Sequence, residues 1–205
     1  MDIILENVGR RFNQEWIFRK INYRFVQGES YAVLGANGSG KSTLLQILSG
    51  SLSASEGKIN YSVDQQVIDI EAVFTHLSIA APYLELIEEF TLGELITFHF
   101  RFKDAVHGWD LERMIDFLGL GKSRDKEIRY FSSGMKQRVK LLLACCTETP
   151  VLLLDEPTTN LDRQGVDWYY ELIENFSANR TVVVCSNQPI EYDFCKNQLF
   201  INDYK

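Results

Sequence analysis

The pattern of apolar and polar residues changes its period along the chain, and each period predicts a type of element. Apolar and polar side chains alternate over residues 2–8 and 16–26, which predicts strands with one buried and one solvated face. Uninterrupted apolar runs occupy residues 151–155 and 181–185, and such runs are typical of parallel strands buried on both faces. Further strands are expected at residues 31–35, 58–63, 67–74 and 198–202.

Helical spacing of apolar residues is concentrated in the middle of the chain. Residues 92–102 and 110–120 have this spacing, and Gly-Leu-Gly at residues 119–121 marks a helix end. Other helices are expected at residues 41–48, 133–146 and 162–178. Because strands alternate with helices, the fold class is predicted to be α/β with a mostly parallel sheet, interrupted by a helical insertion from about residue 91.

Composition narrows the classes of partner. The formal net charge is −7, from 21 basic and 28 acidic residues, so nucleic acid is not an expected partner, because a phosphate backbone requires a concentrated basic surface. No apolar run approaches the roughly 20 residues of a membrane-spanning helix and no signal peptide opens the chain, so a cytoplasmic location is expected. The cysteines are interpreted as small buried hydrophobes in a reducing compartment; they are Cys145, Cys146, Cys185 and Cys195.

The sequence GANGSGKST, residues 35–43, matches the phosphate-loop pattern G-x-x-x-x-G-K-[ST]. It stands between an expected strand and an expected helix, a context that disfavours the alternative of a chance Gly-rich turn. Glycines let backbone N–H groups turn toward phosphate oxygens, and the start of the helix adds a partial positive charge. Lys41 is expected to reach the β and γ phosphates of ATP, and Ser42 to ligate Mg²⁺. The candidate nucleotide-binding residues here are Gly35, Asn37, Gly38, Ser39, Gly40, Lys41, Ser42 and Thr43.

A second chemical motif, VLLLDEP, occupies residues 151–157. Its apolar residues predict a buried strand, and Asp155 emerges at the C-terminal end, where ligands bind in such sheets. Asp155 is therefore expected to hold Mg²⁺, and Glu156 to act as the base for the attacking water. Taken alone, the two acids would more often be a solvated pair at a strand end, and the phosphate loop favours the catalytic interpretation.

Two further motifs complete a resemblance to a known family. FSSGMKQRVKL occupies residues 131–141 and TTNLD residues 158–162. With the phosphate loop and DEP they resemble ATP-binding cassette (ABC) ATPases, whose signature is LSGGQ followed by x-Q-R and whose D-loop is similar to TTNLD. The motifs follow the family's order over nearly the whole chain. The resemblance implies a single ABC ATPase domain with an antiparallel N-terminal β-subdomain. Its expected parts are the domain at residues 1–205, a nucleotide-binding core at residues 1–90 and 147–205, and a helical subdomain at residues 91–146.

The resemblance also implies partners. In this family two cassettes dimerise head to tail around two ATP molecules, so Ser132, Ser133 and Gly134 are expected to contact ATP held by a second copy. An aromatic side chain normally stacks on adenine; Phe12 holds that position, with Trp16 as the fallback and a core role for Phe12 as the alternative. A separate transmembrane permease is the other expected partner, and it would hold the cassette at the inner face of the membrane.

Several positions depart from the family pattern. Pro82 is the nearest equivalent of a glutamine that touches the metal and the catalytic water, while Ser133 and Met135 replace Gly and Gln of the signature. Asn187 stands where a catalytic histidine contacts the γ-phosphate. An asparagine amide can donate a hydrogen bond, but it cannot take up and release a proton near neutral pH as a histidine does. We therefore predict that ATP binding and dimerisation are retained, while hydrolysis is slow or is supported mainly by Glu156.

Two functions remain in competition. The first is an ATPase subunit that powers an ABC transporter; the alternative is a soluble ABC-type switch that reports ATP by dimerising, which the weakened catalytic positions favour. Residues 82–90 (PYLELIEEF) are either a docking surface for a permease helix or ordinary core with a solvated edge. A kinase would not need the signature and D-loop, and a GTPase would need an NKxD motif, which the chain lacks.

Overall fold

The computed structural model describes all residues of the chain, 1–205. It divides into two compact units. The first comprises Met1–Ile79, Thr149–Glu156 and Asn179–Lys205, and the second comprises Ala80–Glu148 and Pro157–Ala178. The predicted α/β class, with one antiparallel and one mostly parallel sheet, is confirmed.

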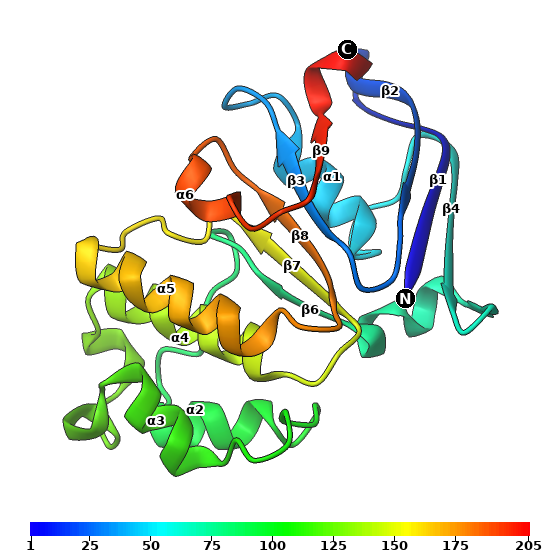
Figure 1. The fold of residues 1–205 in the computed structure, drawn as a ribbon. Helices are drawn as coiled ribbons and strands as arrows, with labels where there is room; N and C mark the ends of the chain where they lie inside the picture. The colour runs from blue at the N-terminus through cyan, green and yellow to red at the C-terminus, as the bar shows by residue number, and fades with distance from the viewer. The chain divides into compact units, whose positions relative to one another are not determined.

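The antiparallel sheet of the first unit has the strand order β2-β1-β4-β5 (Figure 1). Its strands are β1 (Asp2–Phe12), β2 (Glu15–Phe25), β4 (Glu56–Val63) and β5 (Gln66–Ile68). β1 and β2 form a hairpin whose register shifts between the pairs Arg10–Phe18 and Arg11–Trp16, which leaves Ile17 as an extra residue of a bulge. Three consecutive apolar residues, 16–18, interrupt the alternation at this point.

The second sheet has the strand order β6-β7-β8-β3-β9. Its strands are β3 (Ser30–Leu34), β6 (Leu77–Ala80), β7 (Val151–Asp155), β8 (Thr181–Cys185) and β9 (Asn197–Phe200). β3 is parallel to both β8 and β9, and β7 is parallel to β8. The carboxyl ends of β3, β7 and β8 therefore meet at one edge, which brings the segments that follow them together.

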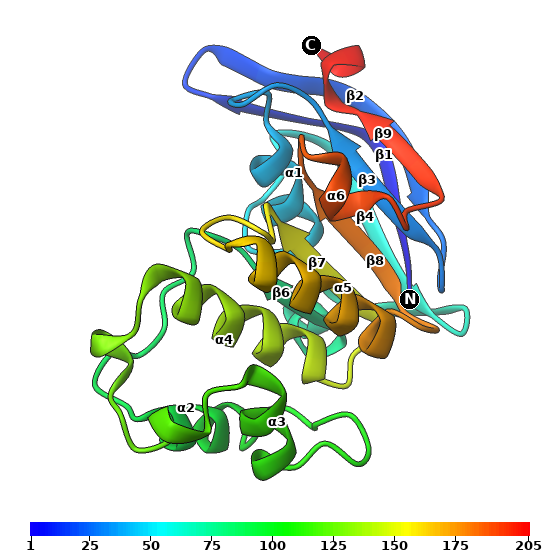
Figure 2. The same ribbon diagram turned by 60° about the vertical axis from the view of Figure 1, so that its left-hand side comes forward.

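Helix α1 (Lys41–Leu48) lies between the two sheets (Figures 1 and 2). Its buried Leu44 and Leu45 share one hydrophobic core with Phe18 of the antiparallel sheet and Leu153 of the parallel one. All residues of β7 and β8 are buried, which accounts for their uninterrupted apolar runs. The same core fixes the direction in which α1 leaves β3, and so the place of the loop between them.

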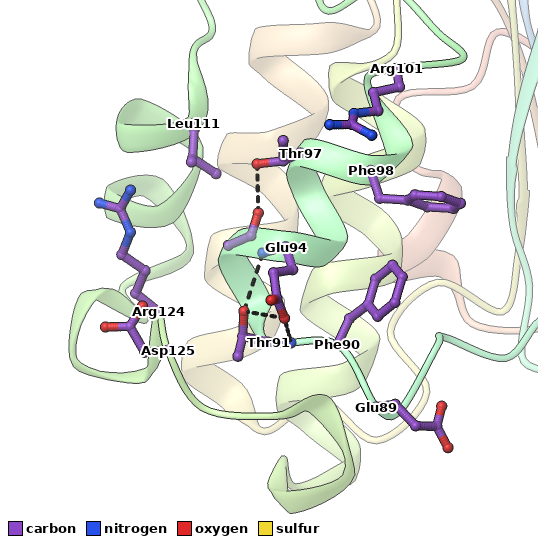
Figure 3. A pocket seen from close by; sticks show the side chains of 11 residues that line it. Glu89, Phe90, Thr91, Glu94, Thr97, Phe98, Arg101, Leu111, Arg124 and Asp125 are labelled. Atoms are coloured by element: carbon purple, nitrogen blue, oxygen red, sulfur yellow. Dashed lines mark hydrogen bonds between the residues drawn. The ribbon is translucent and has the colours of Figure 1, made fainter.

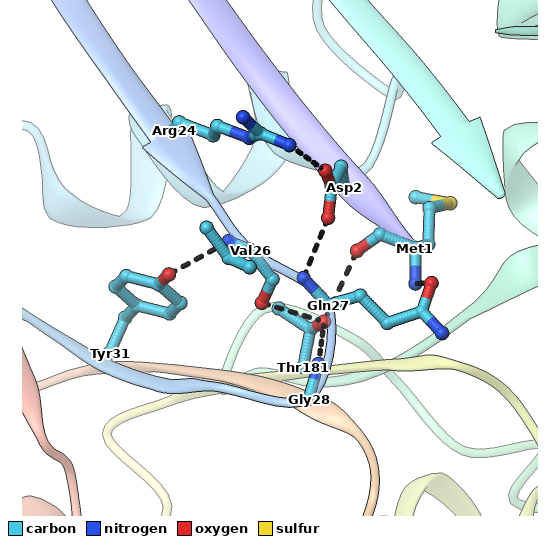
Figure 4. A network of polar contacts seen from close by, with 8 residues as sticks. All are labelled: Met1, Asp2, Arg24, Val26, Gln27, Gly28, Tyr31 and Thr181. Carbon is cyan, nitrogen blue, oxygen red and sulfur yellow. Dashed lines mark hydrogen bonds and ion pairs between the residues drawn. The ribbon is translucent and has the colours of Figure 1, made fainter. Parts of the chain in front are cut away.

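A polar network fastens the N-terminus of the chain to the parallel sheet (Figure 4). Asp2 accepts hydrogen bonds from Arg24 at 2.5 Å and from the N–H of Gln27 at 2.7 Å. The hydroxyl of Thr181, at the start of β8, donates to the carbonyl oxygen of Met1 at 3.2 Å. These bonds join β1, the turn after β2 and β8 at the end of the sheet opposite to the phosphate loop.

The second unit is helical. It contains α2 (Leu92–His99), α3 (Leu111–Leu118), α4 (Ser133–Cys146) and α5 (Arg163–Phe176), and α4 and α5 run side by side (Figure 2). Each helix begins where a side chain caps it: Thr91 forms a capping box with Glu94, and Asp110, Ser132 and Asp162 accept from the first turns. Gly119 ends α3 in a left-handed conformation with φ 66°, as the Gly-Leu-Gly sequence predicts.

Most predicted elements are confirmed, and one is wrong in part. Helices 41–48 and 133–146 and strands 151–155 and 181–185 have the predicted bounds. The expected strand at 67–74 ends at Ile68, and a 3-10 helix follows at Ile70–His76. Val73 and Leu77, four residues apart, are both buried, whereas Ile70 is 49% exposed, so burial here follows a helical spacing and not the alternation of a strand. The short elements β6 and α6 (Pro189–Tyr192) were not predicted.

Candidate functional site

The phosphate loop joins β3 to α1 and requires glycine at two positions. Gly40 has φ 108°, and a Cβ there would lie 2.4 Å from Cγ2 of Ile17. Gly38 has φ 75°, but a Cβ there would meet no atom within 4 Å. No side chain caps the start of α1, so its first N–H groups remain available to an anion. The loop thus has the geometry of a phosphate cradle.

Lys41 is held at the base of this loop. It is only 5% exposed, and its Nζ donates to the carbonyl oxygens of Gly35 at 2.8 Å and Ala36 at 3.4 Å. These bonds hold the ammonium group inside the loop, within reach of an anion that the loop binds. That Lys41 reaches the β and γ phosphates of ATP stays a prediction.

Asp155 presents a buried carboxylate to the same edge of the sheet. It is 2% exposed, and neither carboxylate oxygen has a hydrogen-bond partner of standard geometry. Burial raises the pKa of Asp155, and the nearby Ser42 hydroxyl opposes that shift. A buried carboxylate without partners is costly unless a cation compensates it. Carboxylate and hydroxyl oxygens are hard ligands of the kind that Mg²⁺ prefers, so Asp155 and Ser42 fit the predicted magnesium site.

Glu156 follows Asp155 with an unusual backbone conformation. Its φ is 43°, which non-glycine residues rarely adopt, and its N–H donates to the carbonyl oxygen of Cys185 at 2.9 Å. Glu156 lines a cavity of about 190 Å³ together with residues of the phosphate loop and Ile17; the loop residues are Asn37, Gly38, Gly40, Lys41, Ser42 and Thr43. The structure therefore places the predicted base beside the predicted cradle.

Ile17 is a cavity residue that sequence reasoning missed. It is the extra residue of the bulge in β2, and it contributes an apolar wall beside Gly40. The signal in the sequence is the run Trp16-Ile17-Phe18, which breaks the alternation as a bulge would.

Asn187 is the second residue after β8, and its side chain reaches the phosphate loop. Its Nδ2 donates to Oδ1 of Asn37 at 2.7 Å, and both residues are exposed. Ser186, by contrast, is 0% exposed, and its N–H donates to the carbonyl oxygen of Val33 in β3 at 3.2 Å. The structure thus brings the predicted sensor position to the loop that it would serve.

The two aromatic candidates for adenine stacking differ in how far their rings are covered. Phe12 is 46% exposed, with the guanidinium of Arg10 4.5 Å from its ring centre. Trp16 has two guanidinium groups over its ring, Arg19 at 4.1 Å and Arg11 at 5.6 Å. The ring of Phe12 is therefore more accessible than that of Trp16, and its exposure disagrees with the alternative of a core role, while stacking on adenine stays a prediction.

The signature residues lie at the start of α4 in the second unit. Ser132 caps the helix and accepts a hydrogen bond from the N–H of Met135 at 3.2 Å. A Cβ at Gly134 would lie 2.9 Å from the carbonyl oxygen of Asn160, so the segment TTNLD contacts the signature. Together these segments line a cavity of about 290 Å³, to which Arg138 also contributes. Gln137 is buried and donates to the carbonyl oxygen of Pro157 at 2.8 Å, a structural role.

A larger cavity of about 740 Å³ lies elsewhere in the second unit, around α2 (Figure 3). It is lined by Phe90 and Phe98, whose rings lie 5.2 Å apart, and by charged residues; these are Glu89, Glu94, Arg101, Arg124 and Asp125. None of the predicted site residues lines it. In the preceding segment Tyr83, Leu84 and Ile87 are all more than a third exposed, and Pro82 offers only its carbonyl oxygen, to Lys140 at 3.3 Å.

A model of the ABC transporter family matches residues 18–159. The chain belongs to the ABC transporter family. Members of the ABC ATPase family bind and hydrolyse ATP. None of the helices of this cassette is both long and apolar enough to cross a membrane.

Known cassettes are similar over nearly the whole chain. The ABC transporter ATP-binding protein YkpA of Bacillus subtilis (strain 168) is 29% identical over an alignment of 242 residues, covering 98% of this chain and 44% of that protein. This cassette therefore spans less than half of that relative. The structure of an ATP-binding subunit of an ABC transporter has a TM-score of 0.83 at 20% identity, covering 98% of this chain and 85% of that one. The dimeric structure of MJ0796, a bacterial ABC transporter cassette, has a TM-score of 0.79 at 23% identity, covering 97% and 94%.

Proposed function

We propose that this cassette binds ATP with Mg²⁺ and hydrolyses it to power an ABC transporter. The observation that carries the proposal is the buried carboxylate of Asp155, which has no hydrogen-bond partner of standard geometry and stands beside Lys41 and the Ser42 hydroxyl of the phosphate loop. A buried anion next to an ammonium group and an open helix N-terminus is the charge arrangement that a metal-bound triphosphate completes.

Each residue has a distinct task in this proposal. The loop N–H groups and Lys41 bind the phosphates, and Asp155 and Ser42 hold Mg²⁺. The metal ion neutralises charge that develops on the phosphate oxygens. Glu156, which lines the cavity of the phosphate loop, accepts the proton of the attacking water. The Asn187 amide, now bonded to Asn37, turns to donate to the γ-phosphate, while Phe12 stacks on adenine.

A second copy of the cassette completes each site. The helix α4 begins at Ser133, with Ser132 as its N-cap and Gly134 as its second residue. The start of a helix has N–H groups without partners in the helix, and these favour an anion. ATP held by one copy would meet this helix start on the other, so ATP joins the two copies and hydrolysis separates them. That MJ0796 was solved as a dimer supports this arrangement.

Hydrolysis is proposed to be slow. Asn187 cannot act as an acid or a base near neutral pH, and Pro82 has neither an N–H nor an amide side chain to offer the water. Glu156 would then supply most of the general-base catalysis. Neither Asn187 nor Pro82 lines the cavity of the phosphate loop, so most of the groups that bind ATP are kept.

The test compares Glu156→Gln with Asp155→Asn in the purified chain. Glu156→Gln should bind ATP, fail to hydrolyse it and accumulate as an ATP-bound dimer in light scattering. Asp155→Asn should lose the dependence of ATP binding on Mg²⁺. A Glu156→Gln variant that hydrolyses ATP at the wild-type rate would refute the assigned base, and one that stays monomeric in ATP would refute the ATP-joined dimer.

The transmembrane partner is proposed from the exposed apolar side chains of residues 82–90, which a permease helix would cover. The cassette would then be peripheral at the inner face of the membrane. A soluble ATP-dependent switch is the second candidate, favoured by Asn187 and Pro82 at catalytic positions. Co-purification with a polytopic membrane protein, lost when Tyr83 and Ile87 are changed to serine, supports the transporter; ATP-dependent dimers without any membrane partner support the switch.

A further inference from the structure

A buried carboxylate lies behind the end of β8, outside the set of side chains expected to touch ATP. Glu191, in the short helix α6, is 0% exposed. It accepts a hydrogen bond from the hydroxyl of Ser186, which is also 0% exposed and is the first residue after β8. Burying a carboxylate is costly unless hydrogen bonds compensate it. The hydrogen bonds of Glu191, and not its packing alone, are therefore the reason to look for a role.

Ser186 connects Glu191 to the edge of the sheet where the phosphate loop begins. Its N–H donates to the carbonyl oxygen of Val33 in β3 at 3.2 Å. Its Oγ also accepts from the N–H of Gln188 at 2.8 Å, and the N–H of Glu191 donates back to the carbonyl oxygen of Gln188 at 2.9 Å. The residues on both sides of position 187 are therefore held, and the turn closes on the Ser186 hydroxyl.

Asn187 is the residue that this turn presents. Its side chain is exposed and reaches Oδ1 of Asn37 at 2.7 Å. A side chain at the tip of a turn takes its direction from the backbone of that turn, so the bonds of Ser186 set where the Asn187 amide points. The chain of contacts runs from Glu191 through the Ser186 hydroxyl and the Gln188 N–H to the amide of Asn187.

We propose that Glu191 is a positioning residue for ATP hydrolysis, which holds the Ser186 hydroxyl and thereby aims the Asn187 amide at the phosphate loop. The proposal rests on the role proposed above for Asn187 in hydrolysis. Without the Glu191 carboxylate the Ser186 hydroxyl keeps only the long hydrogen bond to the carbonyl oxygen of Gln188, at 3.4 Å, so the turn is held less firmly. ATP binding is unaffected, because neither Glu191 nor Ser186 lines the cavity of the phosphate loop.

The test is a double-mutant cycle that measures single-turnover ATP hydrolysis by the purified chain. Glu191→Leu removes the acceptor at similar size, Ser186→Ala removes the donor, and Glu191→Gln keeps an acceptor oxygen as the matched control. Glu191→Leu and Ser186→Ala should each lower the rate on the order of tenfold, less than the roughly hundredfold cost of a 1 Å misplacement. ATP affinity should stay unchanged, Glu191→Gln should retain most of the rate, and in an Asn187→Ala background Glu191→Leu should have no further effect.

The outcomes separate the two proposals. If Glu191→Leu lowers the rate by the same factor with and without Asn187, the positioning role is wrong. If Asn187→Ala lowers the rate while Glu191→Leu and Ser186→Ala do not, the role of Asn187 survives and only that of Glu191 is refuted. If Asn187→Ala leaves the rate unchanged, both fail.

A second measurement is independent of turnover and of the Glu191→Leu variant. The side-chain amide resonances of Asn187 in a ¹⁵N-labelled chain should shift in Ser186→Ala and stay near their wild-type positions in Glu191→Gln. Unshifted Asn187 resonances in Ser186→Ala would refute the proposal even if the Glu191→Leu variant failed to fold.

Discussion

Gly38 and Gly40 should respond differently to alanine, because the space around their Cα atoms differs. Both have positive φ, 75° and 108°, so alanine is strained at either position. A Cβ at Gly40 overlaps Ile17 at 2.4 Å and approaches Phe18 at 3.1 Å, whereas a Cβ at Gly38 meets nothing within 4 Å. Because Gly38 lines the cavity that Lys41 and Glu156 share, the empty space beside it is where a phosphate would lie.

The magnitudes follow from these contacts. Backbone strain alone should cost Gly38→Ala about 1 kcal/mol, which corresponds to a fall of about 2–4 °C in Tm for a chain of this size. Gly40→Ala adds an overlap of about 1–3 kcal/mol, which brings the total to about 2–4 kcal/mol, so its Tm should fall by about 4–16 °C. Gly38→Ala should instead weaken ATP binding by about tenfold to a hundredfold, since a methyl group displaces charge-assisted hydrogen bonds of about 1.5–3 kcal/mol.

The assays are thermal unfolding without nucleotide and titration with ATP and Mg²⁺ at a temperature well below the Tm of each variant. Gly28→Ala is the matched control, because Gly28 lies in the same unit with φ 80° and nothing within 4 Å, yet does not line the cavity. It should lose the same stability as Gly38→Ala and keep the wild-type affinity for ATP. If Gly38→Ala bound ATP as tightly as Gly28→Ala, the loop would not be the phosphate cradle.

Two further predictions concern single side chains. Asn187→His should raise the steady-state ATPase rate, by up to about a hundredfold if proton transfer limits the reaction. If the variant hydrolysed ATP more slowly than the wild type, the amide of Asn187 would not be the cause of slow hydrolysis. Arg24 donates to Asp2 and, as the largest cause, lowers the pKa of this carboxyl from its ordinary 3.8. Asp2→Asn should therefore lower Tm at neutral pH, with a difference that persists above pH 3.8 and disappears as the pH falls through the lowered pKa of Asp2; unfolding scans at pH 7 and pH 2.5 would check this, and an equal loss at both would refute it.

The parts of the site that the sequence predicted are those fixed by local rules. Glycines at 38 and 40, the helix start at Lys41 and the strand end at Asp155 follow from backbone conformation and burial patterns that short segments specify. The sheet order then brings these segments together, since parallel strands of a doubly wound sheet end at one edge. Local chemistry and topology therefore sufficed for the phosphate loop and the acid of β7.

The parts that the sequence did not predict depend on contacts between distant segments. Ile17 lines the cavity because a bulge shifts the register of β2 against β1. The amino-acid sequence shows only an interruption of the alternation at this point. Glu191 reads as a solvated acid in a short polar segment, yet the fold buries it completely against Ser186. The 3-10 helix at Ile70–His76 replaces part of an expected strand because Val73 packs into the core at helical spacing.

Two departures from the family pattern, Asn187 and Pro82, concern catalysis and not the binding of ATP within one copy. The groups that would bind ATP in its ground state, the glycine loop, Lys41 and Asp155, are all present and are brought together in the first unit. In the proposed mechanism, Asn187 and Pro82 stand instead where groups act on the water and the transferring phosphate, interactions that strengthen mainly in the transition state. Losing such interactions lowers kcat and leaves ground-state affinity intact. A cassette altered in this way would keep its ATP-joined dimer for longer, because hydrolysis separates the two copies. The lifetime of that dimer is then set by the rate of hydrolysis, which Glu156 and the turn around Asn187 control.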